Sequence, residues 1–63
     1  MKTFKCYIVL LNGVAINSYK KLSYANKLVA SIREKTWFSD ENDLLEIYDK
    51  ENGCVIYTNE NNT

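Results

Sequence analysis

The sequence predicts an α+β domain in the order ββαββ, in which one helix packs on one face of a four-stranded, mostly antiparallel sheet. Two Asn-Gly pairs, at positions 12–13 and 52–53, each stand between apolar, β-prone runs, which is a strong indication of a hairpin. One stretch between them has the apolar periodicity of a helix. We expect a single domain over residues 1–63, and a chain of this length buries only about 60% of the surface that it exposes when unfolded.

The first hairpin is expected to pair residues 3–11 with residues 14–19 through a two-residue primed turn, because such a turn needs positive φ at both central positions. The second hairpin is expected to pair residues 44–49 with residues 54–58 through a looser loop, 50–53. The chain contains no proline, so any of these strands is allowed in the middle of the sheet.

The helix is expected to begin after Ser23, a good N-cap residue, and to run from Tyr24 to Lys35 or Trp37. Its apolar positions follow the i, i+3, i+4, i+7 spacing and form one stripe: Ala25, Leu28, Val29 and Ile32. Residues 59–63 are polar and are expected to form a disordered tail.

The first hairpin is apolar on both faces, although one helix covers only one of them. In a regular two-residue hairpin Val9 lies opposite Ile16, and Tyr7 lies opposite Ser18. One face then carries Tyr7, Val9, Leu11, Val14 and Ile16, and the other carries Phe4, Cys6, Ile8, Leu10, Ala15 and Tyr19. Either the tail or the 38–43 loop covers the second apolar face, or that face binds another protein chain. We take the first of these two sets as the candidate partner-binding face.

An aromatic pair and an acidic segment follow the helix. Trp37 and Phe38 lie off the apolar stripe, so they either fold back onto the core or form an exposed aromatic anchor of the kind found in binding hot spots. Asp40, Glu41 and Asp43 follow directly. We include all five residues in the candidate partner-binding site.

The charges are divided between the two halves of the sequence. Seven basic residues and one acid occur through Lys35, whereas seven acids and one lysine occur from Thr36 onward. Such a division orients a charged partner or a second copy of the chain, and we expect a homodimer.

The basic half also allows a different function, in which a small sheet-based protein binds nucleic acid. Lysines neutralise phosphates and exposed aromatic rings stack on unpaired bases. The candidate residues for this alternative are Lys5, Tyr19, Lys20, Lys21 and Lys27. A sequence pI near 6.1 and the seven acids of the second half oppose it.

The sequence contains no histidine, no glycine-rich phosphate loop and no nucleophile motif. We therefore expect no catalytic residues, no metal site and no cofactor. Cys6 and Cys54 are expected to be free thiols in half-buried strand positions. The apolar run at positions 6–11 is short for a signal peptide, and no stretch approaches the ~20 apolar residues of a membrane span. We expect a cytoplasmic protein, in a bacterium or an infected cell.

Three segments carry a resemblance at the level of architecture: YIVLLNGVAINSY, SYANKLVA and EIYDKENGCVIY. Together they resemble the very short ββαββ host-interaction proteins encoded by bacteriophages and other mobile elements. The resemblance implies a non-catalytic inhibitor or regulator that binds a host or bacterial enzyme stoichiometrically.

Overall fold

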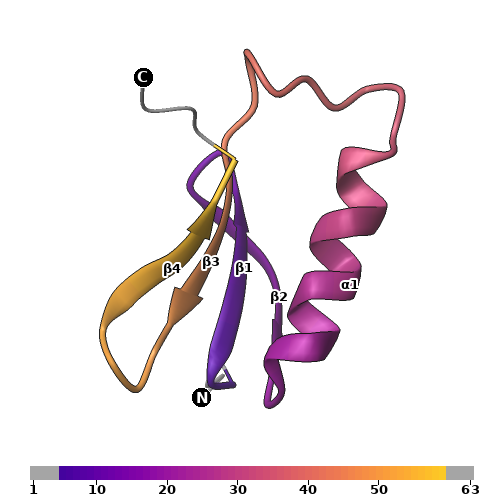
Figure 1. Cartoon of the computed structure of the whole chain (residues 1–63). Coiled ribbons are helices and arrows are strands. Elements are labelled where there is room, and N and C mark those ends of the chain that lie inside the picture. The colour runs from indigo at the N-terminus through magenta and orange to yellow at the C-terminus, as the bar shows by residue number, and fades with distance from the viewer. Residues whose placement is uncertain (1–4, 60–63) are drawn as a thin grey trace.

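The computed structural model describes residues 5–59 and confirms the α+β, ββαββ fold (Figure 1). The elements are β1 (Tyr7–Leu11), β2 (Val14–Tyr19), α1 (Leu22–Arg33), β3 (Leu45–Asp49) and β4 (Cys54–Thr58). Residues 3 and 4 of the expected first strand, and residues 60–63 of the expected tail, lie outside the described residues.

The strands lie in the order β2-β1-β3-β4, and each hydrogen-bonded pair is antiparallel. Because β1 lies between β2 and β3, those two strands run in the same direction and α1 is the crossover that connects them. Figure 1 shows α1 in a layer of its own on one side of the sheet. The two hairpins therefore meet along β1 and β3, while β2 and β4 are the edge strands.

The β1–β2 turn has the predicted primed geometry, with φ of 53° at Asn12 and 83° at Gly13. Asn12 also connects the turn to the segment before β3. Its backbone N–H donates to the Leu44 carbonyl oxygen (2.7 Å), and its side-chain Oδ1 accepts from the Leu44 N–H (2.8 Å). The turn residue thereby holds the start of β3 beside the end of β1.

A bulge in β2 changes the register expected for the first hairpin. Leu10 pairs with Ala15, but Val9 pairs with Asn17 and Tyr7 pairs with Tyr19, which leaves Ile16 as the extra residue. The predicted pairs of Val9 with Ile16 and of Tyr7 with Ser18 are therefore wrong. A one-residue shift moves the following side chains to the other face of a strand, so Tyr19 lies on the helix side and packs against the core.

The helix begins two residues earlier than expected and ends sooner. Lys21 is the N-cap and makes no side-chain capping bond, while Ser23 lies inside the first turn. Only two residues separate β2 from the helix, so the chain enters α1 before Ser23 is reached. At the other end the Lys35 N–H donates to the Ile32 carbonyl oxygen (3.0 Å), an i→i−3 bond that tightens and ends the helix.

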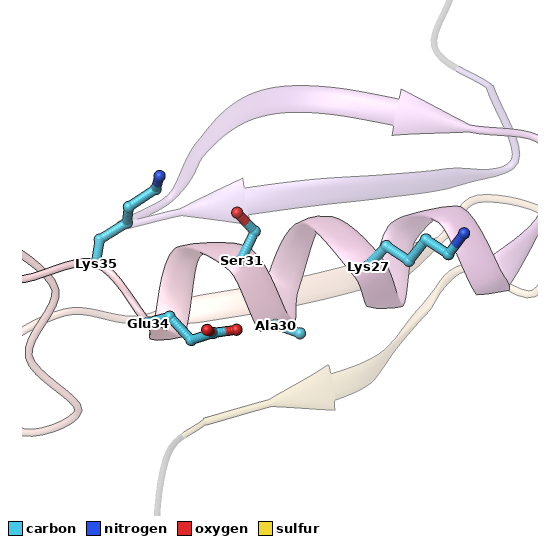
Figure 2. A pocket seen from close by; sticks show the side chains of 5 residues that line it. All are labelled: Lys27, Ala30, Ser31, Glu34 and Lys35. Atoms are coloured by element: carbon cyan, nitrogen blue, oxygen red, sulfur yellow. The ribbon is translucent and has the colours of Figure 1, made fainter.

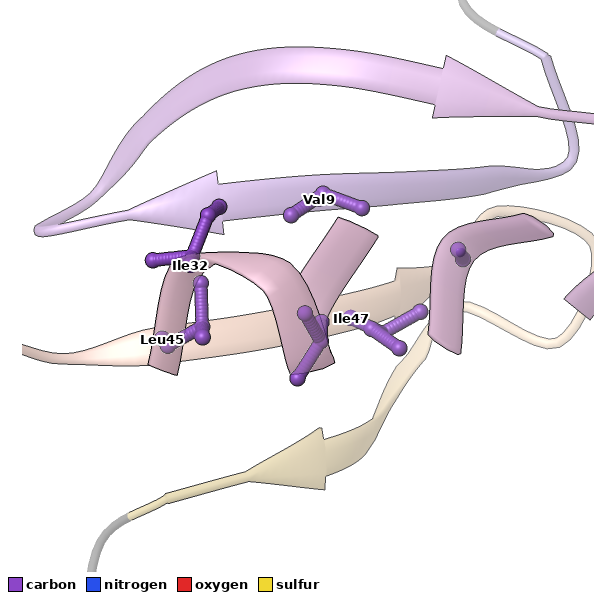
Figure 3. Packing of buried hydrophobic residues seen from close by; sticks show 6 residues of the cluster. Val9, Ile32, Leu45 and Ile47 are labelled. Atoms are coloured by element: carbon purple, nitrogen blue, oxygen red, sulfur yellow. The ribbon is translucent and has the colours of Figure 1, made fainter. Parts of the chain in front are cut away.

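The core lies between α1 and the two central strands (Figure 3). Its members are fully or almost fully buried: Val9, Ala25, Val29, Ile32, Leu45 and Ile47. The helical stripe predicted from the sequence supplies three of them, and Leu28 packs at the margin. The core therefore uses one face of the sheet only.

The β3–β4 loop is organised by a buried carboxylate. Asp49 is 7% exposed, and its oxygens accept hydrogen bonds from the backbone N–H groups of Glu51 (3.1 Å) and Asn52 (3.3 Å) and from the Asn52 side chain (2.7 Å). Gly53 closes the loop with φ of 68° and an N–H bond to the Asp49 carbonyl oxygen (2.7 Å). Asp49 therefore holds the loop by the side-chain-to-backbone bonding typical of aspartate in turns.

Candidate binding surfaces

The sheet face away from α1 carries a row of apolar side chains. Ile8 and Tyr48 alternate with the buried Val9 and Ile47, so they point away from the helix. The register aligns Ile8 with Tyr48 and Tyr48 with Val55 across three strands. We call this surface the uncovered face and define it by Ile8, Leu10, Ala15, Tyr48 and Val55. Within residues 5–59 the one helix packs on the opposite side.

The uncovered face is on the opposite side of the β1–β2 hairpin from the partner-binding face predicted from the sequence. Val9 is fully buried, and Tyr7 and Leu11 pack against the core, because α1 covers their side of β1. Their assignment to an exposed partner-binding face is therefore wrong. Val14 and Ile16 are exposed, at the hairpin tip and the bulge respectively. Alternation in the sequence shows two apolar faces, but it contains no signal for which one the helix covers.

Trp37 and Phe38 separate in the structure. Phe38 is half-buried and packs against the core, whereas Trp37 is 58% exposed. Their rings lie edge to face, with centroids 6.3 Å apart. Phe38 therefore closes the end of the core, and Trp37 is the exposed member of the pair.

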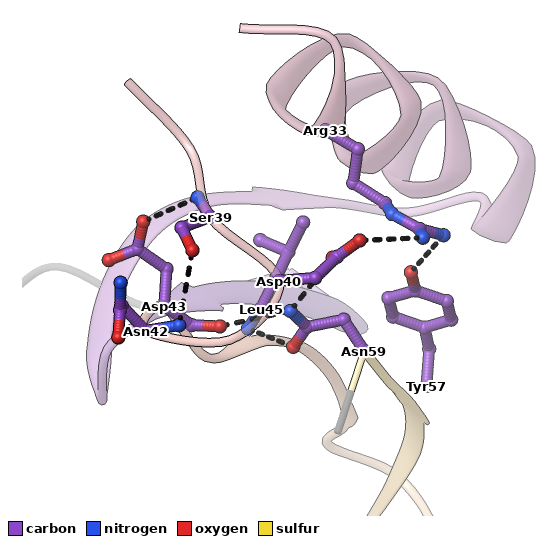
Figure 4. Close-up of polar contacts among 8 residues, drawn as sticks. All are labelled: Arg33, Ser39, Asp40, Asn42, Asp43, Leu45, Tyr57 and Asn59. Atoms are coloured by element: carbon purple, nitrogen blue, oxygen red, sulfur yellow. Dashed lines mark hydrogen bonds and ion pairs between the residues drawn. The ribbon is translucent and has the colours of Figure 1, made fainter. Parts of the chain in front are cut away.

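The acidic segment makes many of its contacts within the chain (Figure 4). Asp40 Oδ2 lies 3.4 Å from an Arg33 guanidinium nitrogen, and its Oδ1 accepts a bond from the Asn59 side chain (3.3 Å). Asp43 accepts bonds from the Ser39 N–H (2.9 Å) and from the Asn12 side chain (3.1 Å). Glu41 is exposed. Asp40 and Asp43 thus hold the loop between α1 and β3.

Asn59 is part of the fold and not the start of a disordered tail. Its side chain accepts a bond from the Leu45 N–H (2.7 Å) and donates to the Asp43 carbonyl oxygen (2.9 Å). Its backbone N–H donates to the Leu45 carbonyl oxygen (3.1 Å). The polar composition of the last five residues concealed this role, because the partners of Asn59 come from a distant segment.

These hydrogen bonds and charge contacts shift the pKa values of two side chains, Asp43 and Arg33. The Ser39 N–H and then the Asn12 amide stabilise the charged form of Asp43 and lower the pKa of its carboxyl. The Tyr57 oxygen, followed by the Asp40 carboxylate, raises the pKa of the Arg33 guanidinium above its already high ordinary value. Arg33 therefore remains charged, with bonds to both partners across the end of the helix.

The lowered pKa of Asp43 predicts a loss of stability in acid. A carboxyl whose folded-state pKa lies below the unfolded value of about 3.9 stabilises the fold above that value and loses this effect as the pH falls through the folded pKa. Asp43→Asn should therefore melt below the parent protein at pH 7, and the difference should shrink as the pH approaches about 2. Thermal unfolding at both pH values measures it, with Glu41→Gln as the control. A difference that stays constant with pH would show that the charge of Asp43 has no role.

Basic and aromatic side chains gather where β2 leads into α1. Lys20 and Lys21 precede the helix, Lys27 and the 52%-exposed Tyr24 lie on it, and all three lysines are exposed. The Tyr24 ring centroid lies 6.3 Å from that of Tyr19 and 5.8 Å from Lys27 Nζ. We call Lys20, Lys21, Tyr24 and Lys27 the basic–aromatic patch.

The patch includes three of the residues expected for nucleic-acid binding, Lys20, Lys21 and Lys27, and it adds Tyr24. Tyr19 is half-buried beneath it and accepts a bond from the Asn17 side chain (3.0 Å). Lys5 is exposed, and its backbone N–H donates to Ser18 Oγ (3.1 Å) on the neighbouring strand. Tyr24 was not among the residues expected for nucleic-acid binding, although its position next to the lysines and off the apolar stripe was a usable signal.

A shallow hollow of about 330 Å³ lies along one side of α1 (Figure 2). Its lining residues come from the helix and the two positions after it: Lys27, Ala30, Ser31, Glu34 and Lys35. The view shows Ser31 and Lys35 on the side toward the β1–β2 hairpin and Glu34 on the other side. Since these residues form one wall, the hollow does not enclose a ligand.

Both cysteines are free, as expected, but only Cys6 is half-buried. Cys54 is exposed because it begins the edge strand β4. The Cys6 thiol lies 3.5 Å from a Glu51 carboxylate oxygen. Residues 5–59 contain no group of three or more cysteine, aspartate or glutamate side chains arranged to hold a metal ion.

Over residues 5–59, the fold and these surfaces define a small α+β domain whose one helix covers one face of the sheet. No protein-family model, curated protein or solved structure matches it at a significant level. No helix in the described part of the chain is long and apolar enough to cross a membrane.

Proposed function

We propose that this chain is a non-catalytic protein-binding module that docks a partner protein on the uncovered face. The observation that carries the proposal is the apolar row of Ile8, Tyr48 and Val55 across three strands, on the side of the sheet opposite the helix. Antiparallel sheets that face water on one side ordinarily alternate apolar and polar residues. An apolar outer row is instead typical of a surface that another chain covers.

The edge strands support docking on the face and not along an edge. β2 has a bulge at Ile16, and β4 has its own register shift opposite Ile47 and Tyr48, which leaves Ile56 as the extra residue. Bulges disturb the ladder of free N–H and C=O groups that an added strand needs. Both edges of this sheet are therefore poor templates for strand addition.

The second row of the face suggests the chemistry of the partner. Leu10 lies between Ala15 and Glu46, and Glu46 lies beside Thr58. A partner that covers this row needs apolar groups over Leu10 and a basic or hydrogen-bond-donating group near Glu46, because an unpaired carboxylate is costly to bury. Such stoichiometric binding agrees with the role of an inhibitor or regulator of a host or bacterial enzyme, which the resemblance to short phage proteins implies.

A matched pair of charge insertions tests the proposal. Val55 is 45% exposed on the uncovered face, and Val14 is 63% exposed at the hairpin tip, opposite Leu11 on the helix side. Val55→Lys places a charge in the apolar row, whereas Val14→Lys adds the same charge elsewhere. Both positions are exposed, so we expect each variant to lose less than about 1 kcal/mol of stability.

The tagged chain, purified from cells that contain its partner, should retain one protein in stoichiometric amount. The Val14→Lys variant should retain the same amount of this protein as the parent chain. The Val55→Lys variant should retain at least tenfold less, as measured by quantitative mass spectrometry. Equal retention by the two variants would place the partner elsewhere. The absence of any stoichiometric partner, with the chain monomeric in solution, would contradict the proposed function.

A further inference from the structure

The basic–aromatic patch lies at the end of the molecule that is remote from the acidic loop. Residues 5–33 include no aspartate or glutamate, so the lysines of the patch have no acidic neighbour in sequence. Figure 1 shows the loop after α1, which contains Asp40, Glu41 and Asp43, at the opposite end of the helix. The near-neutral total charge therefore does not describe this surface, which is locally cationic.

Three of the acidic residues also have hydrogen-bond or ion-pair partners within the chain. Asp40 pairs with Arg33, Asp43 bonds to Ser39 and Asn12, and Asp49 is buried in the β3–β4 loop. Asp49 lies at the same end of the sheet as the patch, because Tyr7 pairs with both Tyr19 and Asp49. Its oxygens are occupied by hydrogen bonds from Glu51 and Asn52. The sequence-level objection that the acidic half repels a phosphate backbone is thus weaker in the folded chain.

The patch combines its cations with an exposed aromatic ring. The Tyr24 ring contacts the half-buried Tyr19 ring, and the Lys27 ammonium group lies over its face. A ring oriented by its neighbours loses little side-chain entropy when it binds a ligand. The β2 bulge produces this arrangement, because the register shift brings Tyr19 to the helix side of the sheet.

This composition fits one kind of anion better than others. Lysines alone would serve a duplex, an acidic peptide or a single strand equally well. An exposed ring among lysines adds a stacking surface for unpaired bases, which a duplex keeps within its own stack and an acidic peptide does not have. We propose that the basic–aromatic patch binds single-stranded nucleic acid, with Lys20, Lys21 and Lys27 on phosphates and Tyr24 against a base.

The proposal is tested on the whole chain by fluorescence anisotropy with a labelled 20-nucleotide oligo-dT, between 50 and 200 mM NaCl. Neutralisation of one phosphate by each of three lysines predicts a slope of log K against log salt of about −2, since each contact on a single strand contributes about −0.7. Lys20→Gln, Lys21→Gln and Lys27→Gln should each reduce the slope by about 0.7. Lys35→Gln, beyond the other end of α1, should leave it unchanged.

Tyr24 provides the second arm of the test. Tyr24→Ala should weaken oligo-dT binding by about 5- to 100-fold, and Tyr24→Phe should keep it, because stacking needs the ring and not the hydroxyl. Absence of binding at 50 mM NaCl would overturn the proposal. Equal binding of a poly-glutamate peptide or of a DNA duplex would overturn the assignment to single strands. Val55→Lys should bind oligo-dT at least as well as the parent, which keeps this result separate from that for the uncovered face.

Discussion

Replacement of Ile47 by alanine is expected to lower the free energy of unfolding by about 2–5 kcal/mol, the usual cost of such a truncation in a core. Ile47 is fully buried on β3, where it pairs with Val9 on one side and with Tyr57 on the other. The loss is large in proportion, because a chain of 63 residues has a total stability of only about 3–9 kcal/mol. A substantial fraction of the variant should be unfolded at 37 °C.

Ile56 provides a control of the same residue type. It is the extra residue of the β4 bulge and is 42% exposed, so Ile56→Ala removes the same atoms without opening a cavity. We expect a loss of less than about 1 kcal/mol. Urea denaturation followed by circular dichroism gives both values. Similar losses for the two variants would show that the core does not lie between α1 and the central strands.

Asp49→Ala is expected to destabilise the fold by about 2 kcal/mol. The substitution removes one charged acceptor of three hydrogen bonds, from Glu51 N–H, Asn52 N–H and the Asn52 side chain. Bonds to a charged group contribute about 1.5–3 kcal/mol, and here the exposed donors of the loop regain part of that from water. The effect should be largest on the β3–β4 hairpin, whose amide hydrogens should exchange faster.

Two further variants separate the role of the carboxylate from that of its charge. Asp49→Asn keeps one oxygen that accepts from both backbone N–H groups, and it should recover at least half of the lost stability. Asp40→Ala removes an exposed aspartate whose ion pair with Arg33 is solvated, and it should cost less than about 1 kcal/mol. If Asp40→Ala were as harmful as Asp49→Ala, burial of Asp49 would not be the source of its effect.

Local sequence signals were sufficient for most of the secondary structure. The Asn-Gly pairs marked both turns, and three of their four residues, Asn12, Gly13 and Gly53, have positive φ. The apolar stripe of the helix supplied Ala25, Val29 and Ile32 to the core as expected. These signals act over a few residues, so a single sequence contains them completely.

Long-range contacts were not predictable in the same way. The β2 bulge has no signal in the sequence, because Val14, Ala15 and Ile16 are all apolar, yet it moved Tyr19 to the helix side, next to Tyr24. Asp43 and Asn59 resemble ordinary loop and tail residues, although each bonds to segments that are 16 or more positions away. Their roles depend on which distant segment the fold brings near them.

The division of charge shows the difference most clearly. By itself the sequence determined the elements, their order and the presence of two apolar faces on the first hairpin, because periodicity and turn chemistry are local properties. Only the tertiary structure decided that α1 covers the Val9 face and leaves the Ile8 face uncovered within residues 5–59. It also decided that the lysines of the patch lie at one end of α1, while the loop with Asp40, Glu41 and Asp43 lies at the other. The physical reason is that strand order, register and helix placement depend on packing between residues far apart in the chain, where alternation permits either face to be buried.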